Sequence, residues 1–582
     1  MVYTKGAPDQ FPIRRAPASY GGSLAESISQ GPLAVAVANR LLDGMGFTRL
    51  VNGMVEWDSR QCRVSPGDAI KSLIVNMASI RERPALLNVM EAYDNVPVGI
   101  MFDSVESPDD LNRYALARNL DRLHEAGPSR VYYRLASSLR AHYRIISRAA
   151  HSDTTSVNVW GEYESEFQKD GGIDITYGFS KDKRPDLKQY MVGNVVDENG
   201  ISLFAKPLDG NTSDVTWNKE CIDSIMDVLK RDDLIYVADS KVVTDKLVKK
   251  LDDAKVRFLS RLPANFGDGL QRKILGQVDV CTLRKLEKLE GEEKRADRWF
   301  TELPAEYEGI GLRMIPQRTS STKGKGDKAV EEERESFRSV VDSFQKTYAC
   351  MRDAEAAVAK FVKRMRKAHP IFLIEPRYLT AVETRRGRGR PRKDGSGAIT
   401  EERIVVELGF SEDAEAREAL WRSKEMIVLV TNVPSKEDDP ERGMDAEELI
   451  RLYVNEWKVE GGFATIKKPA IADRLFLEKE SRAEALIQVF CMGVLVRGLM
   501  QLLIRRGLGE MADEELPPYG VDGRALQRNV THEYFIKKVQ NIQVLYFQAT
   551  GTFHYCNDAA QSRAEFFIRA MGIEPRSLFG GS

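Results

Sequence analysis

The sequence predicts a mixed α/β protein in which a helical N-terminal part precedes a mixed sheet, and a large insertion interrupts that sheet. Three observations support this fold class. Apolar residues recur at helical spacing up to about residue 145, short β-rich runs then alternate with helices, and a highly charged, irregular stretch lies between about residues 264 and 424. At roughly 150 residues per domain, the 582-residue chain has room for about three or four domains.

Composition and charge exclude several classes of protein. Hydrophobic residues make up 42% of the chain and charged residues 30%, which is typical of globular proteins and not of fibres, disordered linkers or porins. The 86 basic and 87 acidic residues nearly cancel, to a net charge of -1. Any binding of nucleic acid therefore has to come from local basic patches.

The cysteines and the apolar runs indicate a reducing, cytoplasmic setting. The six cysteines lie far apart and form no Cys-x-x-Cys pair, which argues against a structural zinc site or a disulfide framework. The N-terminus lacks the apolar core of a signal peptide. The longest apolar run, Leu486–Ile504, contains Gln488 and Arg497, and a charge is costly in lipid, so we expect a buried helix and no membrane partner.

Residues 1–145 form the first predicted domain, which is mostly helical. Helical spacing of apolar residues extends over Leu33–Leu50, Ala69–Ile80 and Leu111–Leu123, and Gly127 with Pro128 ends the last of these helices. A plain helical bundle and a domain that binds DNA ends both fit this pattern.

Residues 146–263 form the first part of the predicted α/β core. Strands are predicted over Ala149–Val159, Gln189–Val196 and Ile201–Pro207, and Asn199-Gly200 before the last of them is a strong hairpin signal. A helix (Trp217–Lys230), a strand (Leu234–Asp239), a helix (Val243–Leu251) and a strand (Val256–Leu262) follow. The order β-β-β-α-β-α-β builds a mixed sheet covered by helices.

Residues 264–424 are predicted to be an inserted domain. Its main helical signal is a heptad-like apolar stripe that runs from Phe337 to Met365 and ends before Pro370. We expect one long helix that packs on its own domain, in preference to an intermolecular coiled coil. The core resumes over residues 425–510, with a strand at Met426–Val433 and a helix from Asp445 to about Lys468, and residues 511–582 form a C-terminal region.

Two aspartates lie where predicted strands meet turns. Asp153 lies in HSDTTSV, and Asp239 follows the apolar run of LIYVADS. Strand ends line the ligand crevice of an open α/β sheet, so two carboxylates at this edge can share a divalent cation. The ordinary role of a single aspartate at such a position is a turn or a helix cap. His151 is expected to be a strand residue and not a ligand.

A predicted helix in LYVNEWKVEGGFATIKKP carries polar side chains along one face. Tyr453, Glu456, Glu460 and Lys467 are separated by three, four and seven residues, which approximate whole turns of 3.6 residues. The two glycines that follow Glu460 are poor helix formers unless something packs closely against them. We therefore expect a ligand or another element against this face.

Taken together, these short sequence segments resemble those of the DDE transposases of bacterial insertion sequences, in the group with a Tyr-(2)-Arg-(3)-Glu-(6)-Lys signature. Tyr453, Glu460 and Lys467 match the signature in type and spacing, and Glu456 stands where the signature has arginine. Further matching words are HSDTTS, ITYGFSKDKRPDLKQ, PLDGNTSD, VADSKVVT, FLSRLP and MIVLVTN. The resemblance covers roughly residues 146–262 and 426–510.

The resemblance implies an RNase H-like fold and a metal-binding catalytic triad of Asp153, Asp239 and Glu460. Such a site binds two Mg²⁺ ions, which Mn²⁺ can replace, and catalyses phosphodiester hydrolysis and transesterification. Carboxylates suit these hard cations, and no histidine base is needed. The implied partners are double-stranded DNA, as terminal inverted repeats and as target, and further copies of the chain in a homodimer or higher oligomer. On DNA the protein would be associated with the nucleoid.

Two other functions share these features. One is a catalytically inactive, DNA-binding descendant of a transposase, and the other is a metal-dependent endonuclease without a strand-transfer step. The presence of all three acidic residues favours an active enzyme over the inactive descendant. The products of the reaction would separate the transposase from the nuclease.

Several further residues are predicted to contact DNA. Tyr453 and Lys467 share the face of Glu460, and Lys467 is expected to contact a terminal phosphate. Lys181, Lys183 and Arg184 lie in a basic loop after the first catalytic strand, where they are expected to contact the phosphate backbone.

The most basic segment of the chain is also a predicted DNA contact. Arg385 to Lys393 contains six basic residues and no acidic one, between runs with strand character at Tyr378–Glu383 and Arg403–Leu408. Its centre, Arg388-Gly389-Arg390-Pro391, resembles the core of an AT-hook, so Arg388 and Arg390 are expected in a narrow A·T minor groove.

Trp299 is the insertion residue on which a flipped base would stack if the protein forms hairpin DNA ends. A packed tryptophan inside a small domain is the simpler interpretation of the same residue.

Overall fold

The computed structural model divides into two compact units. The first comprises Met1–Val242, Lys255–Arg257 and Arg451–Ser582, and the second comprises Val243–Ala254 and Phe258–Ile450. The structure describes residues 28–79, 89–160, 171–231, 233–289, 295–386, 398–454, 467, 479–520, 523–547, 552–555 and 557–578. Both units combine helices with sheets, so the predicted mixed α/β class is confirmed.

The first unit holds the N-terminal helices, a mixed sheet and the C-terminal elements. Its helices are α1 (Leu33–Gly44), α2 (Phe47–Asn52), α3 (Pro66–Ser79), α4 (Val98–Met101), α5 (Arg113–Glu125), α6 (Pro128–His142), α7 (Asp214–Arg231), α16 (Glu480–Gly509), α17 (His532–Val539) and α18 (Asp558–Ala570). Its strands are β1 (Ile28–Pro32), β2 (Ala149–Val159), β3 (Lys188–Val196), β4 (Ser202–Leu208), β5 (Ile235–Ala238), β15 (Gln543–Phe547) and β16 (Thr552–Tyr555).

The N-terminal helices follow the sequence prediction with two differences. The predicted helix over Leu33–Leu50 is two helices, α1 and α2, because Gly46 between them adopts a left-handed φ of 71°. Gly127 and Pro128 end one helix and also begin the next, since Pro128 is the first residue of α6. Proline suits that position because its missing N–H group would have no helical partner there.

The mixed sheet of the first unit has the strand order β4-β3-β2-β5. β2 pairs antiparallel with β3 and parallel with β5, and β3 pairs antiparallel with β4. The Asn199-Gly200 hairpin is confirmed, because Gly200 has a φ of 83° and Asp197 Oδ1 accepts hydrogen bonds from the N–H groups of Asn199 (2.9 Å) and Ile201 (2.8 Å).

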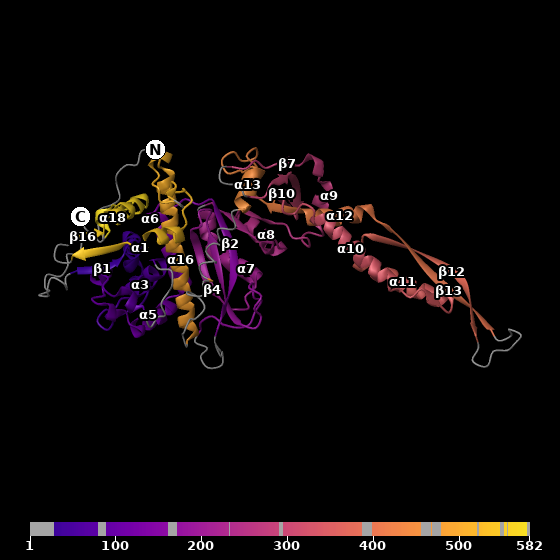
Figure 1. The fold of residues 1–582 in the computed structure, drawn as a ribbon, viewed down its shortest axis with the longest axis horizontal. Helices are drawn as coiled ribbons and strands as arrows, with labels where there is room; N and C mark the ends of the chain where they lie inside the picture. Colours follow the sequence, from indigo (N-terminus) through magenta and orange to yellow (C-terminus); the bar gives the residue numbers. More distant parts are fainter. Residues whose placement is uncertain are drawn as a thin grey trace. The chain divides into compact units, whose positions relative to one another are not determined.

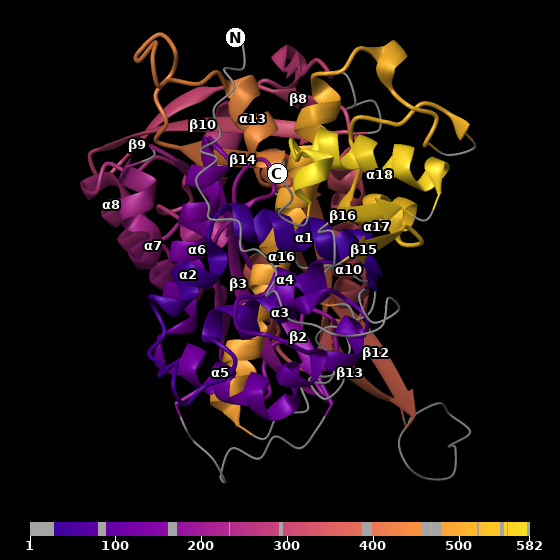
Figure 2. The ribbon, with the colours of Figure 1, turned by 90° about the vertical axis from the view of Figure 1, so that its left-hand side faces the viewer.

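α16 is a core helix of the first unit. It packs against α3, α5, α6, α18 and β4, and Figure 2 shows it passing between these elements. By length and composition it could cross a membrane, but 78% of its most apolar 18-residue window is buried inside the protein. Gln488 donates to the Ala205 carbonyl (3.0 Å), and Arg497 donates to His532 Nδ1 (3.1 Å). The predicted buried helix is therefore confirmed, and its polar residues have partners in the fold.

The second unit is built from sheets with flanking helices. Its helices are α8 (Asp245–Asp253), α9 (Leu270–Gln277), α10 (Lys325–Asp342), α11 (Met351–Ala368), α12 (Ala414–Glu425) and α13 (Ala446–Val454), whose last turn belongs to the first unit. Its strands are β6 (Phe258–Arg261), β7 (Arg284–Lys285), β8 (Arg298–Phe300), β9 (Leu303–Tyr307), β10 (Ile310–Thr319), β11 (Thr347–Tyr348), β12 (Phe372–Arg386), β13 (Ala398–Glu412) and β14 (Met426–Thr431). One sheet has the order β6-β14-β10-β8-β7, with β9 on β10, and the other has the order β11-β13-β12.

The predicted long helix of the insertion is wrong, because the stripe lies on two helices. α10 ends at Asp342 and α11 begins at Met351, and the short strand β11 lies between them. The stripe residues still face two apolar clusters, and Phe344 packs against both; its ring centroid lies 4.5 Å from that of Phe361. Figure 1 shows α10 and α11 running along the hairpin of β12 and β13.

The hairpin predicted around the basic segment is confirmed. β12 and β13 pair antiparallel from Phe372 opposite Glu412 to Arg386 opposite Ala398. The segment that joins the strands, with Arg388 and Arg390, lies outside the described residues. The predicted domain borders lie after residues 145, 263, 424 and 510, and they stay predictions. The division into compact units follows other limits, since it places α8, β6 and β14 in the same unit as the insertion.

Candidate active site

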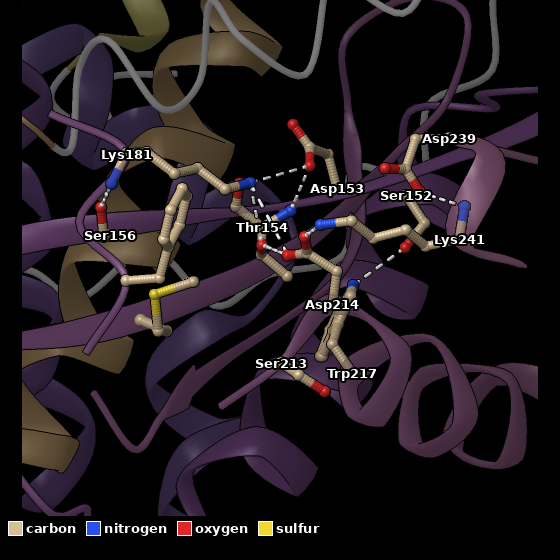
Figure 3. A network of polar contacts seen from close by, with 12 residues as sticks. Ser152, Asp153, Thr154, Ser156, Lys181, Ser213, Asp214, Trp217, Asp239 and Lys241 are labelled. Carbon is tan, nitrogen blue, oxygen red and sulfur yellow. Dashed lines mark hydrogen bonds and ion pairs between the residues drawn. The ribbon is translucent and has the colours of Figure 1, made fainter. Parts of the chain in front are cut away.

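Asp153 and Asp239 lie at the same level on neighbouring strands. β5 pairs with β2 in parallel register up to Ala238 opposite Ser152, and each aspartate is the next residue of its chain. Adjacent strands lie about 4.8 Å apart. Parallel pairing thus brings together two carboxylates that are 86 positions apart in the sequence. Asp239 follows the end of β5, as predicted, whereas Asp153 lies inside β2, which continues to Val159, so its predicted position at a strand end is wrong (Figure 3).

Lys181 joins Asp153 to a third carboxylate, Asp214, the first residue of α7. Its ammonium Nζ lies 3.4 Å from Asp153 Oδ1 and 3.7 Å from Asp214 Oδ1. It also donates to the Thr154 carbonyl at 2.5 Å, and the Thr154 hydroxyl donates to Asp214. The loop that carries Lys181 is fixed to β2 as well, because its backbone N–H donates to Ser156 Oγ at 2.9 Å.

Lys241 joins Asp239 to the same third carboxylate. Its backbone N–H donates to Asp239 Oδ1 at 3.0 Å, and its side-chain ammonium forms an ion pair with Asp214 Oδ2. The Asp214 side chain is 14% exposed, whereas the Lys241 side chain is 50% exposed. Asp214 therefore receives two ammonium groups, one from each side of the candidate site (Figure 3).

The pKa values of two carboxyl groups in the network, Asp153 and Asp214, are shifted in opposite directions. Burial raises the pKa of Asp153 above its usual value, although the nearby Lys181 ammonium opposes this shift. Burial also acts on Asp214, but hydrogen bonds from Lys241 and Thr154 outweigh it and lower the pKa of that carboxyl. The ion pair with Asp214 raises the pKa of Lys241, and Asp239 and Asp153 add to the rise. One lysine thus lies within electrostatic reach of all three carboxylates.

The strand that carries Asp153 rests on a buried tryptophan. Trp217 on α7 is 1% exposed and donates from Nε1 to the Ser152 hydroxyl at 3.0 Å. It fits only because the residue beneath it, Gly193 on β3, has no side chain; a Cβ atom there would lie 2.5 Å from the ring. His151 is fully buried within β2, in agreement with the expected strand position.

Lys467 lies beside the basic loop and not on a described helix. Its Nζ forms an ion pair with Asp182 Oδ1 at 2.7 Å, in the same loop as Lys181, Lys183 and Arg184. Arg184 pairs with Asp186 at 2.7 Å, and the Lys183 side chain is exposed. The structure thus brings the lysine of the signature close to the loop that is fixed to β2.

The remaining predicted site residues are placed only in part. Tyr453 is half-buried near the end of α13. Trp299 is half-buried on β8, between Lys285 of β7 and Arg318 of β10. Glu456, Glu460, Arg388 and Arg390 lie outside the described residues.

Asp214 and Lys241 are functional candidates that the sequence analysis did not single out. Both lie within words of the resemblance, PLDGNTSD and VADSKVVT, so those words held the signal. Each also has an ordinary local interpretation, since aspartate is favoured in the first turn of a helix and a lysine after a strand is usually solvated. Only the fold shows that their side chains meet.

The chain is similar to a protein family over part of its length and, weakly, to a solved structure. A family described as a domain of unknown function (DUF4277) matches residues 35–137, the region of α1 to α6. A cryo-EM structure of the piggyBac transposase synaptic complex with hairpin DNA matches with a TM-score of 0.35 and 8% identity, over 94% of this chain and 86% of that chain. No curated protein matches the sequence.

Proposed function

We propose that the protein is a DNA transposase that binds the ends of its own insertion sequence and catalyses strand cleavage and strand transfer. The observation that carries the proposal is the parallel pairing of β2 and β5, which places Asp153 and Asp239 at the same level on neighbouring strands. Glu460, in a segment outside the described residues, would complete the DDE triad. The sheet order β4-β3-β2-β5 supports an RNase H-like core for this site.

The donor atoms at this site suit Mg²⁺, with Mn²⁺ as a substitute. Asp153 and Asp239 offer only oxygen ligands, which hard divalent cations prefer. Within the described ranges, no group of three or more metal-ligating side chains converges, so the third ligand has to come from elsewhere, and Glu460 is the candidate. When bound, such ions activate the attacking oxygen and stabilise the leaving oxygen.

The other residues of the chain would bind and orient the DNA. Lys181 lies beside Asp153, and Lys183 and Arg184 belong to the same loop. Lys467 pairs with Asp182 of this loop. Tyr453, Trp299, Arg388 and Arg390 are proposed as further contacts. The partners would be double-stranded terminal repeats, target DNA and a second copy of the chain.

The test is strand cleavage on a plasmid that carries the gene together with its natural flanking DNA. Wild-type protein should cut and join the ends in Mg²⁺ and should be inactive in EDTA. Asp153→Asn, Asp239→Asn and Glu460→Gln should abolish cleavage while DNA binding persists, because affinity comes mainly from basic contacts. Asp227→Asn, on an exposed position of α7, is the matched control and should cleave normally.

Each other outcome has a defined meaning. Cleavage by Glu460→Gln at the wild-type rate would refute the triad. Cleavage without joined products would indicate an endonuclease, and binding without cleavage by the wild-type protein would indicate an inactive descendant.

A further inference from the structure

The candidate site contains two lysines that share one internal counter-ion. Lys181 Nζ lies 3.7 Å from Asp214 Oδ1, and Lys241 Nζ pairs with Asp214 Oδ2. Asp214 is largely buried and is also held by the Thr154 hydroxyl, so its position is fixed. The lysine side chains are 31% and 50% exposed, so their ammonium groups can be reached from solvent.

We propose that Lys181 and Lys241 form a phosphate-binding pair for the DNA strand at this site, and that Asp214 holds both ammonium groups until a phosphate replaces it. This inference rests on the proposed function. In this proposal Lys241 contacts the DNA phosphate directly. Asp214 is a positioning residue, because it competes with the phosphate for the ammonium groups.

The ion pairs are placed for exchange rather than for stability. An ion pair with a half-exposed lysine contributes little to folding, because water screens it and the long side chain loses conformational freedom. The same flexible four-carbon stem lets the ammonium group move a short distance to another anion. The backbone N–H of Lys241 is bound to Asp239 Oδ1, so the side chain that would contact the phosphate begins beside this aspartate.

The charges of the network explain why a counter-ion is needed before DNA arrives. Asp153, Asp214 and Asp239 face two lysines, so carboxylates outnumber ammonium groups at the candidate site. In this state Asp214 occupies the cations, and the site has little attraction for a DNA phosphate. Removing the charge of Asp214 should therefore release Lys241 for DNA. It should also remove one of the two carboxylates that hold Lys181, which Asp153 and the Thr154 carbonyl still bind.

The experiment is the binding of a fluorescent 30-base-pair duplex, followed by anisotropy in EDTA at several salt concentrations. Lys241→Met should weaken binding about threefold to tenfold and reduce the salt slope by about one, as for loss of one phosphate contact. Asp214→Asn should have the opposite sign and tighten binding by a similar factor. Lys241→Arg keeps the positive charge and should bind like the wild type.

Two matched controls lie on the exposed side of α7. Lys219→Met and Asp227→Asn change the net charge of the protein by the same amounts as the test variants, at positions outside the network. Both should leave the affinity and the salt slope within a factor of two of the wild type.

The opposite effects expected for Lys241→Met and Asp214→Asn on DNA affinity distinguish two roles of the ion pair: exchange of Asp214 for a phosphate, and support of the fold alone. If Asp214→Asn and Lys241→Met weaken binding equally, the pair only supports the fold and the inference is wrong; unchanged affinity in both variants also overturns it. A wild-type protein with no measurable affinity for the duplex would refute the proposed function itself, together with the exchange.

Discussion

Gly193→Ala should destabilise the first unit and reduce strand cleavage, because a methyl group at this position collides with Trp217. The added Cβ atom would lie 2.5 Å from three carbons of the indole ring, whereas carbon atoms pack at about 3.5–4.0 Å, so the ring has to move by about 1 Å. Trp217 is 1% exposed and stacks on Phe204 with ring centroids 6.0 Å apart. Overpacking of such a site typically costs about 1–3 kcal/mol.

The displaced ring would also disturb the strand that carries Asp153. Trp217 Nε1 donates to Ser152 Oγ at 3.0 Å, next to the aspartate, and losing this buried hydrogen bond adds about 1 kcal/mol. We therefore expect a loss of about 2–4 kcal/mol in the free energy of unfolding of the first unit. Urea unfolding followed by tryptophan fluorescence measures this loss, and plasmid cleavage measures the effect on the site.

The control for this prediction is another strand glycine. Gly311→Ala on β10 places a Cβ atom that meets nothing within 4 Å, so it should change the unfolding free energy by less than about 0.5 kcal/mol. Wild-type stability and wild-type cleavage in Gly193→Ala would refute the reasoning, because the ring would then have room that the structure does not show.

Three further predictions concern the carboxylate, the core helix and the basic segment. Asp153→Asn should stabilise the metal-free protein at pH 7, because burial raises the pKa of this carboxyl and its ionisation therefore disfavours the folded state above that pKa. The gain should shrink as the pH falls below the unfolded value of 3.8, where the carboxyl becomes protonated in both states, and urea unfolding in EDTA at pH 7 and at about pH 3 checks the sign. Gln488→Leu should lower the free energy of unfolding by about 1–2 kcal/mol, as measured by urea unfolding, since the hydrogen bond to the Ala205 carbonyl is lost in the core. Replacing Arg388 and Arg390 with alanine should cost about 1–3 kcal/mol of binding per lost groove contact, more on A·T-rich than on G·C-rich duplexes, and equal anisotropy losses on both duplexes would contradict groove binding.

Local sequence signals were sufficient for the sheet of the first unit. The Asn199-Gly200 turn needs a left-handed residue, and glycine supplies it at a φ of 83°. The apolar run before Asp239 has no polar residue to expose, so a buried strand was the natural interpretation, and β5 is buried throughout. In such cases each residue carries its own structural preference, and neighbouring residues agree.

The insertion helices show where periodicity fails. The apolar stripe continues through Phe344 and Tyr348, which lie between α10 and α11, because these side chains pack into the same clusters as the helical ones. Tyr348 does so from β11, opposite Ile404. The spacing of apolar residues therefore predicts which residues face a core. It predicts one continuous helix only where no loop or strand interrupts the helix.

The candidate site shows a different limit. The predicted strand end at Asp153 is wrong, because β2 continues beyond it to Val159. Asp239 does follow the end of β5, and it could be proposed from local pattern and the rule for parallel sheets. Asp214 could not, since its partners are Lys181 and Lys241, and these three residues meet only after β2, α7 and the loop before β3 are in place. The sequence around Asp214 indicates only its local role, as the first residue of helix α7. Its contacts with the two lysines depend on the fold and cannot be predicted from neighbouring residues.

Electrostatics gives these long-range contacts a role at the candidate site. Two carboxylates at the same level on adjacent strands repel each other. The protein places Lys181 beside Asp153 and Lys241 within electrostatic reach of both aspartates. These lysines offset the repulsion, and Asp214, fixed by Thr154, keeps them at the site. The same three side chains that allow the carboxylates to lie together therefore also determine which cations a DNA phosphate would meet first.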